Sequence, residues 1–160
     1  MSTSRILAGL LAAAGLALAA SGAGADPQVE ARGVVISEPV VRASIGKAPN
    51  SAAYLVIANT TGVADRLLSA ACACAAKVEA HESHPMAGMP GMMEMSPTGP
   101  VVIPAHGSVA FRPGGKHLML TGLKGRLADG GSQVITLVFE HAGRISVDFQ
   151  VRSKIAAEPR

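Results

Sequence analysis

The sequence has little net charge and no cluster of basic residues. Its 160 residues include 14 lysines and arginines and 11 aspartates and glutamates, which gives a formal net charge of +3. Because nucleic-acid binding requires a concentrated positive surface, we expect no nucleic-acid partner. The sequence also lacks a Ser/His/Asp order, a glycine-rich nucleotide loop and a cluster of paired carboxylates. These absences argue against an enzyme.

Sustained helical periodicity is also missing after residue 20. Only 64–76 is compatible with a helical turn, whereas short runs of alternating hydrophobicity are frequent. In the clearest run, apolar and polar residues alternate from Ile145 to Val151, as a half-buried strand requires. The predicted strands are 29–36, 52–59, 77–81, 101–103, 108–112, 116–121, 133–140 and 144–152. With the turn signals between them, these runs predict an all-β fold, an antiparallel β-sandwich.

The longest uncharged run lies at the N-terminus. Residues 6–20 are rich in leucine and alanine, follow Arg5, and precede the small residues Ala23-Gly24-Ala25. The run is shorter than a membrane span, so residues 1–25 are predicted to be a cleaved signal peptide, with no stable membrane insertion afterwards. The remaining chain divides into one domain, 26–152, and a flexible C-terminal tail, 153–160.

Methionine is absent from the strongest apolar runs and concentrated in one stretch. Apart from Met1, every methionine lies between residues 81 and 119, whereas 52–58, 134–139 and 145–151 contain none. Methionines that only fill irregular gaps in a core would be scattered. Histidines share the same stretch, so the concentration indicates a chemical role.

Thioether sulfur and imidazole nitrogen together form a ligand set for a soft monovalent metal, and Cu(I) fits this set best. His117 and Met119 fall on one face of a predicted strand, roughly 7 Å apart at the backbone, with Leu118 and Leu120 on the other face. The alternative for this pair alone is a buried strand with a satisfied histidine and a core methionine. The adjacent methionines favour the metal. Thioethers also suit an exported carrier, because they cannot be lost to disulfides outside the cytoplasm.

Several short stretches along the domain share the pattern of one protein family. They are Ala52-Ala53-Tyr54-Leu55 with Asn59, Asp65-Arg66-Leu67-Leu68, Val78-Glu79-Ala80-His81-Glu82, Met93-Glu94-Met95, Ile103-Pro104 and 113–120, which reads PGGKHLML. In these stretches the chain resembles the periplasmic copper chaperones called PCu(A)C, and the resemblance spans roughly 29–151. The resemblance implies a cupredoxin-like β-sandwich in the periplasm that binds one Cu(I). The implied ligands are His81, Met95, His117 and Met119.

The third ligand has a competitor. The spacing from Met95 to His117 agrees with the family, whereas the spacing from His81 to Met95 is lengthened by an apparent insertion. Met92 would restore the first spacing at the expense of the second, so we favour Met95.

The stretch 82–92 is predicted to be a loop over one end of the sandwich, because it contains two prolines and two glycines. His84, Met86 and Met89 offer further donors there, either for a second ion or as part of a weakly binding loop. Outside this stretch, His106 and His141 are expected to be solvated.

Cys72 and Cys74 are the only cysteines. In an extended segment their Cα atoms would stand near 7 Å, at the limit for a disulfide, although a tight turn would bring them closer. A strained, reducible disulfide, a second Cu(I) site and two small core residues all remain open.

Three classes of function compete. A blue-copper electron carrier is disfavoured because neither cysteine lies near His117, and a metal-free assembly module leaves the methionines unexplained. The resemblance implies a monomeric chaperone that delivers Cu(I) to the copper subunit of a respiratory cytochrome c oxidase or to its assembly proteins. The alternative within the metal class is copper storage or detoxification. The tail, 153–160, has no soft donor, so we expect no additional Cu(II) site there.

Overall fold

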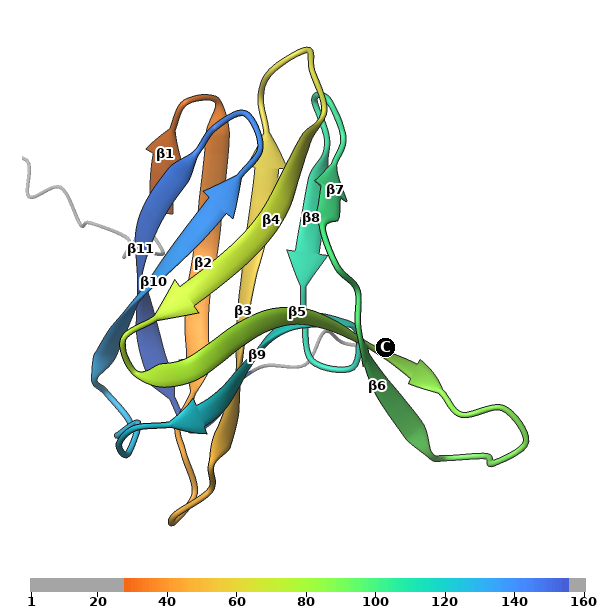
Figure 1. Ribbon diagram of the computed structural model, residues 1–160, viewed down its shortest axis with the longest axis vertical. Coiled ribbons are helices and arrows are strands. Elements are labelled where there is room, and N and C mark those ends of the chain that lie inside the picture. The colour runs from red at the N-terminus through yellow and green to blue at the C-terminus, as the bar shows by residue number, and fades with distance from the viewer. Residues whose placement is uncertain (1–27, 156–160) are drawn as a thin grey trace, which may run out of the picture.

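The computed structural model describes residues 28–155 (Figure 1). The predicted signal peptide, 1–25, lies outside the described residues, as do the last residues of the predicted tail, 156–160. The described part of the chain is built from strands, and it holds no helix long and apolar enough to cross a membrane. The predicted all-β class is therefore confirmed.

Eleven strands form one continuous hydrogen-bonded sheet. In chain order they are β1 (Gln28–Ala31), β2 (Val34–Arg42), β3 (Asn50–Asn59), β4 (Asp65–Cys72), β5 (Ala75–Pro85), β6 (Met93–Pro97), β7 (Val101–Ile103), β8 (Ser108–Phe111), β9 (Lys116–Leu123), β10 (Ser132–Phe139) and β11 (Arg144–Arg152).

The sheet closes on itself through pairing of β2 with β3. The neighbours around this ring are β2, β11, β10, β4, β5, β9 and β3. All of these pairings are antiparallel except that of β11 with β2, which is parallel. The predicted antiparallel sandwich is confirmed, with this parallel pair as its one departure among the described strands.

The core fills the inside of the ring. Its aromatic members are Phe111, Phe139 and Phe149, which are all buried. The alternation predicted for the last strand is seen in β11, where the apolar side chains face inward and the intervening polar ones face outward. No methionine belongs to the core cluster of the described residues. Packing of this core therefore does not explain the methionines of the described residues.

Asp65 anchors the β10–β11 turn to the start of β4. Its carboxylate accepts backbone N–H hydrogen bonds from Arg66, His141 and Ala142 at 2.7, 2.9 and 3.0 Å. Burial by itself would raise the pKa of Asp65, but these three donors outweigh that effect and hold the pKa below its usual range. The carboxylate thus stays charged while it joins the β10–β11 turn to the start of β4.

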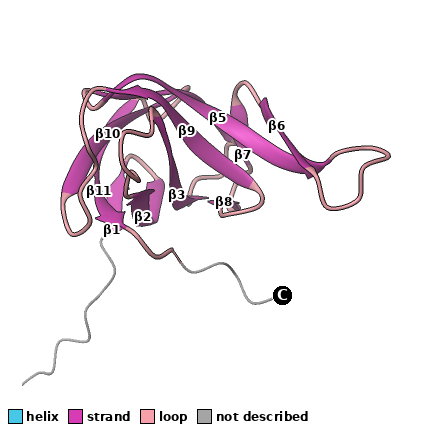
Figure 2. Ribbon diagram, turned by 90° about the horizontal axis from the view of Figure 1, so that it is seen from below, coloured by secondary structure: helices cyan, strands magenta, loops and turns pink. Residues whose placement is uncertain are grey.

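Two expectations for the middle of the chain were wrong. The segment 64–76 contains β4 and the start of β5 instead of a helical turn, because β4 pairs with β7 at its start and with β10 from Leu67 to Cys72. The predicted loop 82–92 begins with four more residues of β5, and β6 pairs with them to make a hairpin. This hairpin projects sideways from the body instead of covering its end (Figures 1 and 2).

Candidate metal site

The β5–β9 pairing places both predicted histidine ligands side by side. His81 and His117 are direct cross-strand partners, and Glu79 stands opposite Met119 in the same ladder. Cross-strand partners and alternate residues of a strand share a face, so His81, His117 and Met119 point to the same side. Leu118 is fully buried on the opposite side. The site therefore lies on the outer face of the ring.

Met95 comes to this face from the hairpin. In the β5–β6 pairing it stands opposite Ser83, which lies two residues from His81 and so on the same side of β5. Met95 also lines one cavity together with His117 and Met119. Met92 lies before β6 and does not line that cavity, although both methionines are exposed, by 53% for Met92 and 58% for Met95. Three of the four predicted ligands thus line one cavity, whereas His81 is not among its lining residues and reaches this face as the cross-strand partner of His117.

His117 is the most constrained of the four predicted ligands. Its ring is buried, and Nδ1 lies 3.1 Å from the carbonyl oxygen of Gly115. Because a carbonyl oxygen can only accept, Nδ1 carries a proton, and in the neutral imidazole Nε2 then presents a lone pair. Nε2 is itself buried and has no hydrogen-bond partner in the part of the chain described. A backbone hydrogen bond on one nitrogen and a free lone pair on the other are what a metal-ligating histidine requires.

His81 packs beside His117 and borders an ion pair. The ring centroids are 5.9 Å apart, and the planes are tilted by 43°. Nε2 of His81 also lies 3.9 Å from Oε2 of Glu79, and the other carboxylate oxygen, Oε1, contacts the Lys77 ammonium at 2.8 Å. The hydrogen bond from Lys77 is the main reason that the pKa of Glu79 is lowered. A charged carboxylate therefore stands next to the candidate site.

The cavity at the site has a volume of about 390 Å³ and is open to solvent on one side. Its lining joins Met95, His117 and Met119 to polar groups from β2 and β3, including Arg42 and Tyr54. Histidine, cysteine and carboxylate side chains alone do not form a metal site here. Among residues 28–155, no group of three or more such side chains is placed to hold a metal ion. The donor set here matches a soft ion through its thioethers. The ligand assignment itself stays a prediction.

The sequence from 34 to 151 matches the model of the LpqE-like family, which is named for the lipoprotein LpqE. The chain belongs to the LpqE-like family. No curated protein matches the chain significantly.

Solved structures similar to this LpqE-like chain include PCuAC domains and DR1885. The copper-bound PCuAC domain from PmoF2 is 24% identical with a TM-score of 0.67, over 79% of this chain and 98% of that one. The Cu(I) form of DR1885 from Deinococcus radiodurans is 27% identical with a TM-score of 0.56, over 84% of this chain and 85% of that one. Apo-DR1885 is 26% identical with a TM-score of 0.54, over 99% and 100%. The resemblance to PCu(A)C proteins is confirmed.

The turn before β9 holds a group that sequence reasoning missed. The carbonyl oxygen of Gly115 accepts hydrogen bonds both from His117 Nδ1 and from the Ser83 N–H, the latter at 3.1 Å. Arg112 and Gly115 close this turn by a backbone hydrogen bond, and Gly114 has φ +84°, as position i+2 of a type II turn requires. The Pro-Gly-Gly signal predicted the turn but not that its carbonyl would orient a histidine.

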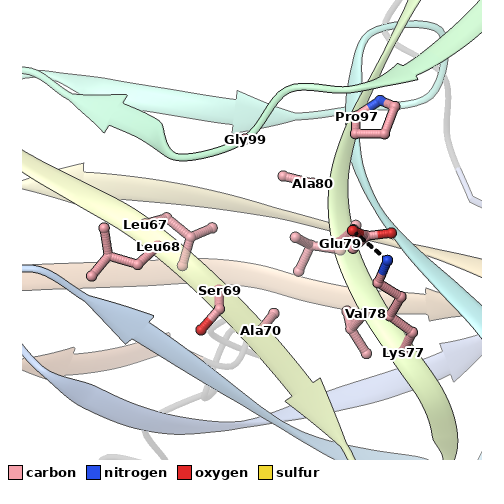
Figure 3. Close-up of a pocket in the computed structure, with 11 residues that line it drawn as sticks. Leu67, Leu68, Ser69, Ala70, Lys77, Val78, Glu79, Ala80, Pro97 and Gly99 are labelled. Carbon is pink, nitrogen blue, oxygen red and sulfur yellow. Dashed lines mark ion pairs between the residues drawn. The ribbon is translucent and has the colours of Figure 1, made fainter.

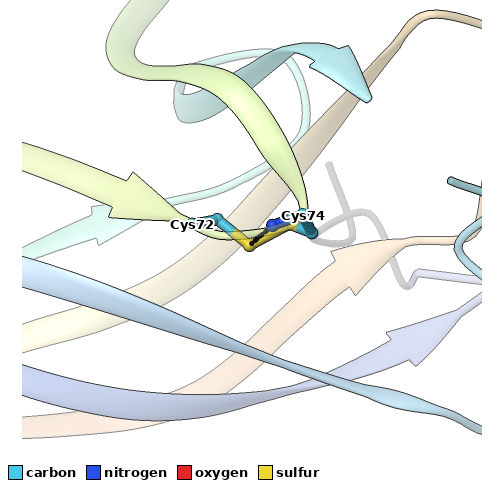
Figure 4. The surroundings of a disulfide bond; sticks show 2 residues. All are labelled: Cys72 and Cys74. Carbon is cyan, nitrogen blue, oxygen red and sulfur yellow. Dashed lines mark hydrogen bonds between the residues drawn. A yellow bond between two sulfur atoms is a disulfide. The ribbon is translucent and has the colours of Figure 1, made fainter. Parts of the chain in front are cut away.

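Cys72 and Cys74 form a disulfide (Figure 4). Cys72 ends β4, and the turn that follows brings the two Cα atoms to 5.1 Å. Among the alternatives left open by the sequence, the disulfide is the one present, because the turn removes the extended geometry. Both residues pack against the core cluster. This hairpin end of β5 is remote from His81 along the strand, so the cysteines do not join the candidate site.

A second cavity, of about 280 Å³, opens between β4 and β5 (Figure 3). These strands pair only at Ala70 and Val78, so they separate beyond that point. Leu67, Leu68 and the Lys77–Glu79 ion pair line the gap, which contains no histidine or methionine. It is therefore not a continuation of the metal site. His106 and His141 are exposed, as predicted.

Proposed function

We propose that this protein is an exported copper chaperone that holds one Cu(I) tightly at His81, Met95, His117 and Met119. Cu(I) is its cargo. Two neutral imidazoles and two thioethers bind a soft cation without compensating its charge, so the ion is held firmly but remains exchangeable. A recipient with thiolate ligands then takes the ion in a favourable direction.

The observation that carries this proposal is the buried, unpartnered Nε2 of His117. A buried nitrogen without a hydrogen bond is destabilising, and proteins keep such groups where a ligand satisfies them. His117 lines a cavity with Met95 and Met119 and packs beside His81, and these neighbours support a soft metal as that ligand. Membership of the LpqE-like family and the likeness to copper-bound PCuAC domains support the same ion.

We further propose that the protein acts in the periplasm as a monomer and delivers Cu(I) to the copper subunit of a respiratory cytochrome c oxidase or to its assembly proteins. The sequence of residues 1–25 supports export, and the family named for a lipoprotein is consistent with it. A site filled by four protein donors leaves no open position for a substrate, which supports transfer of the ion over an enzymatic reaction.

Anaerobic titration against a chromogenic Cu(I) chelator tests the binding step. We expect one tight, colourless d¹⁰ complex, and we expect Met119→Leu to weaken it. An intense thiolate-to-copper visible band, or unchanged binding in Met119→Leu, would contradict the assignment. His141→Leu is the control, because His141 is exposed and lies outside the site.

Delivery and storage are separated in cells. A chaperone is required for oxidase activity at low copper, whereas a storage or detoxification protein is required for growth at high copper. A deletion strain that loses copper tolerance but keeps full oxidase activity would favour the storage alternative.

A further inference from the structure

The tip of the β5–β6 hairpin is built from two consecutive turns that share a methionine. The segment 86–92 reads MAGMPGM, with methionine at every third position. The Met89 N–H donates to the Met86 carbonyl at 3.2 Å, and the Met92 N–H donates to the Met89 carbonyl at 3.1 Å. Gly88 and Gly91 occupy position i+2 of these turns with φ values of +76° and +84°. Each turn is therefore a type II turn with methionine at both ends.

A third hydrogen bond closes the segment into a loop. The Met86 N–H donates to the Met92 carbonyl at 2.9 Å, so each of the three methionines is bonded through its backbone to the other two. In a β-turn the first and last Cα atoms lie within about 7 Å, and these short separations leave three flexible thioethers within reach of one point.

Packing does not account for these methionines. None of the three belongs to the core cluster, and the side chains of Met89 and Met92 are 50% and 53% exposed. The hairpin projects from the body, and β6 pairs only with β5 among the described strands (Figure 2). Met86 is half-buried, whereas Met89 and Met92 are exposed, so burial of apolar surface explains little of this repeated methionine.

We propose that Met86, Met89 and Met92 form a second Cu(I) site, separate from the His/Met site. It rests on the proposed specificity for Cu(I). A set of three neutral thioethers at an exposed tip binds more weakly than four donors in a partly buried cavity, so this site captures and releases the ion readily. Met93 and Met95 follow on the face of β6 that leads to His81, because they stand opposite Pro85 and Ser83. The tip is thus the outer end of a line of sulfur donors.

The experiment follows the methyl resonances of methionine by NMR while Cu(I) is added anaerobically to residues 26–160. We expect the first equivalent to shift Met95 and Met119 and the second to shift Met86, Met89 and Met92, with about ten-fold weaker affinity. The variant carrying Leu at positions 86, 89 and 92 should bind a single equivalent. Met93→Leu is the matched control, because Met93 is 49% exposed on the same hairpin but lies outside the turns, and it should bind both.

A second variant tests the turn geometry apart from methionine content. Gly88→Ala with Gly91→Ala keeps every sulfur atom and meets no neighbour within 4 Å, but it strains both turns because alanine disfavours positive φ. We expect the second affinity to fall about ten-fold with the first unchanged. If the triple leucine variant still bound two equivalents, or if the second equivalent shifted none of the three methyl groups, the tip site would be refuted. A failure of the first equivalent to shift Met95 and Met119 would instead count against the proposed function.

Discussion

The substitution His117→Leu tests whether the buried Nε2 of His117 serves to bind the metal and not to stabilise the fold. The change removes the Nδ1 hydrogen bond to Gly115, which contributes about 1 kcal/mol, and it also removes an unpartnered buried nitrogen that costs about 1–3 kcal/mol. The Gly115 carbonyl keeps the Ser83 N–H as a partner, so no new unsatisfied group is created there. We therefore expect the free energy of unfolding of the copper-free variant to be unchanged or higher by up to about 2 kcal/mol. Urea unfolding of both copper-free proteins measures this difference.

The copper-loaded proteins should show the opposite order. Cu(I) at about 100 times its dissociation constant stabilises the wild type by about 2.7 kcal/mol, and this increment should be largely absent from His117→Leu. His141→Leu should behave as the wild type in both states, because His141 is exposed and does not line the cavity. If copper-free His117→Leu were instead less stable than the wild type by more than about 2 kcal/mol, His117 would be a structural histidine, and the argument from its nitrogen would fail.

Three further predictions concern other residues. Met95→Leu should weaken Cu(I) binding more than Met92→Leu in chelator competition, because only Met95 lines the cavity with His117. Equal losses of affinity would contradict the assignment of Met95 as the third ligand. Asp65→Asn should lower the free energy of unfolding by about 2 kcal/mol at neutral pH. The pKa of Asp65 is lower in the folded than in the unfolded protein, so its contribution to stability is full above about pH 4 and is lost as the pH falls through the folded pKa. The free energies of unfolding of the two proteins should therefore converge in acid. A difference that stays constant with pH would contradict this. Replacing Cys72 and Cys74 by serine should cost about 1.5 kcal/mol, because the closed loop is short, and should leave Cu(I) stoichiometry unchanged; lost copper would place thiols in the site.

The sequence predicted the site face better than the hairpin that completes it. The alternation around Leu118 was enough to put His117 and Met119 together, because a strand has a period of two residues whatever it pairs with. The two-residue period does not specify which strand is the neighbour or in which register the two strands pair. The direct opposition of His81 and His117 depends on the register of β5 against β9, which is set by the whole closed sheet.

The errors arose where local composition opposed tertiary pairing. Alanines made 64–76 compatible with a helical turn. The segment forms the strand β4 instead, because β4 pairs with β10 on one side and β5 on the other. Prolines and glycines made 82–92 look like a loop, although only the part around Gly88 and Gly91 lacks strand pairing. The orienting carbonyl of Gly115 was missed because a backbone atom leaves no signature in side-chain spacing.

Closure of the sheet divides the predicted ligands into two mechanical classes. His81, His117 and Met119 sit on β5 and β9, which belong to the ring, and Met119 is paired with Glu79 on one side and Ala52 on the other. Met95 sits on β6, which pairs only with β5 among the described strands. Amides of β6 should therefore exchange with solvent faster than those of β9, which hydrogen exchange can measure. We expect release to be stepwise: the hairpin swings Met95 away first, the remaining three donors keep the ion attached, and the opened position is where a recipient makes its first bond.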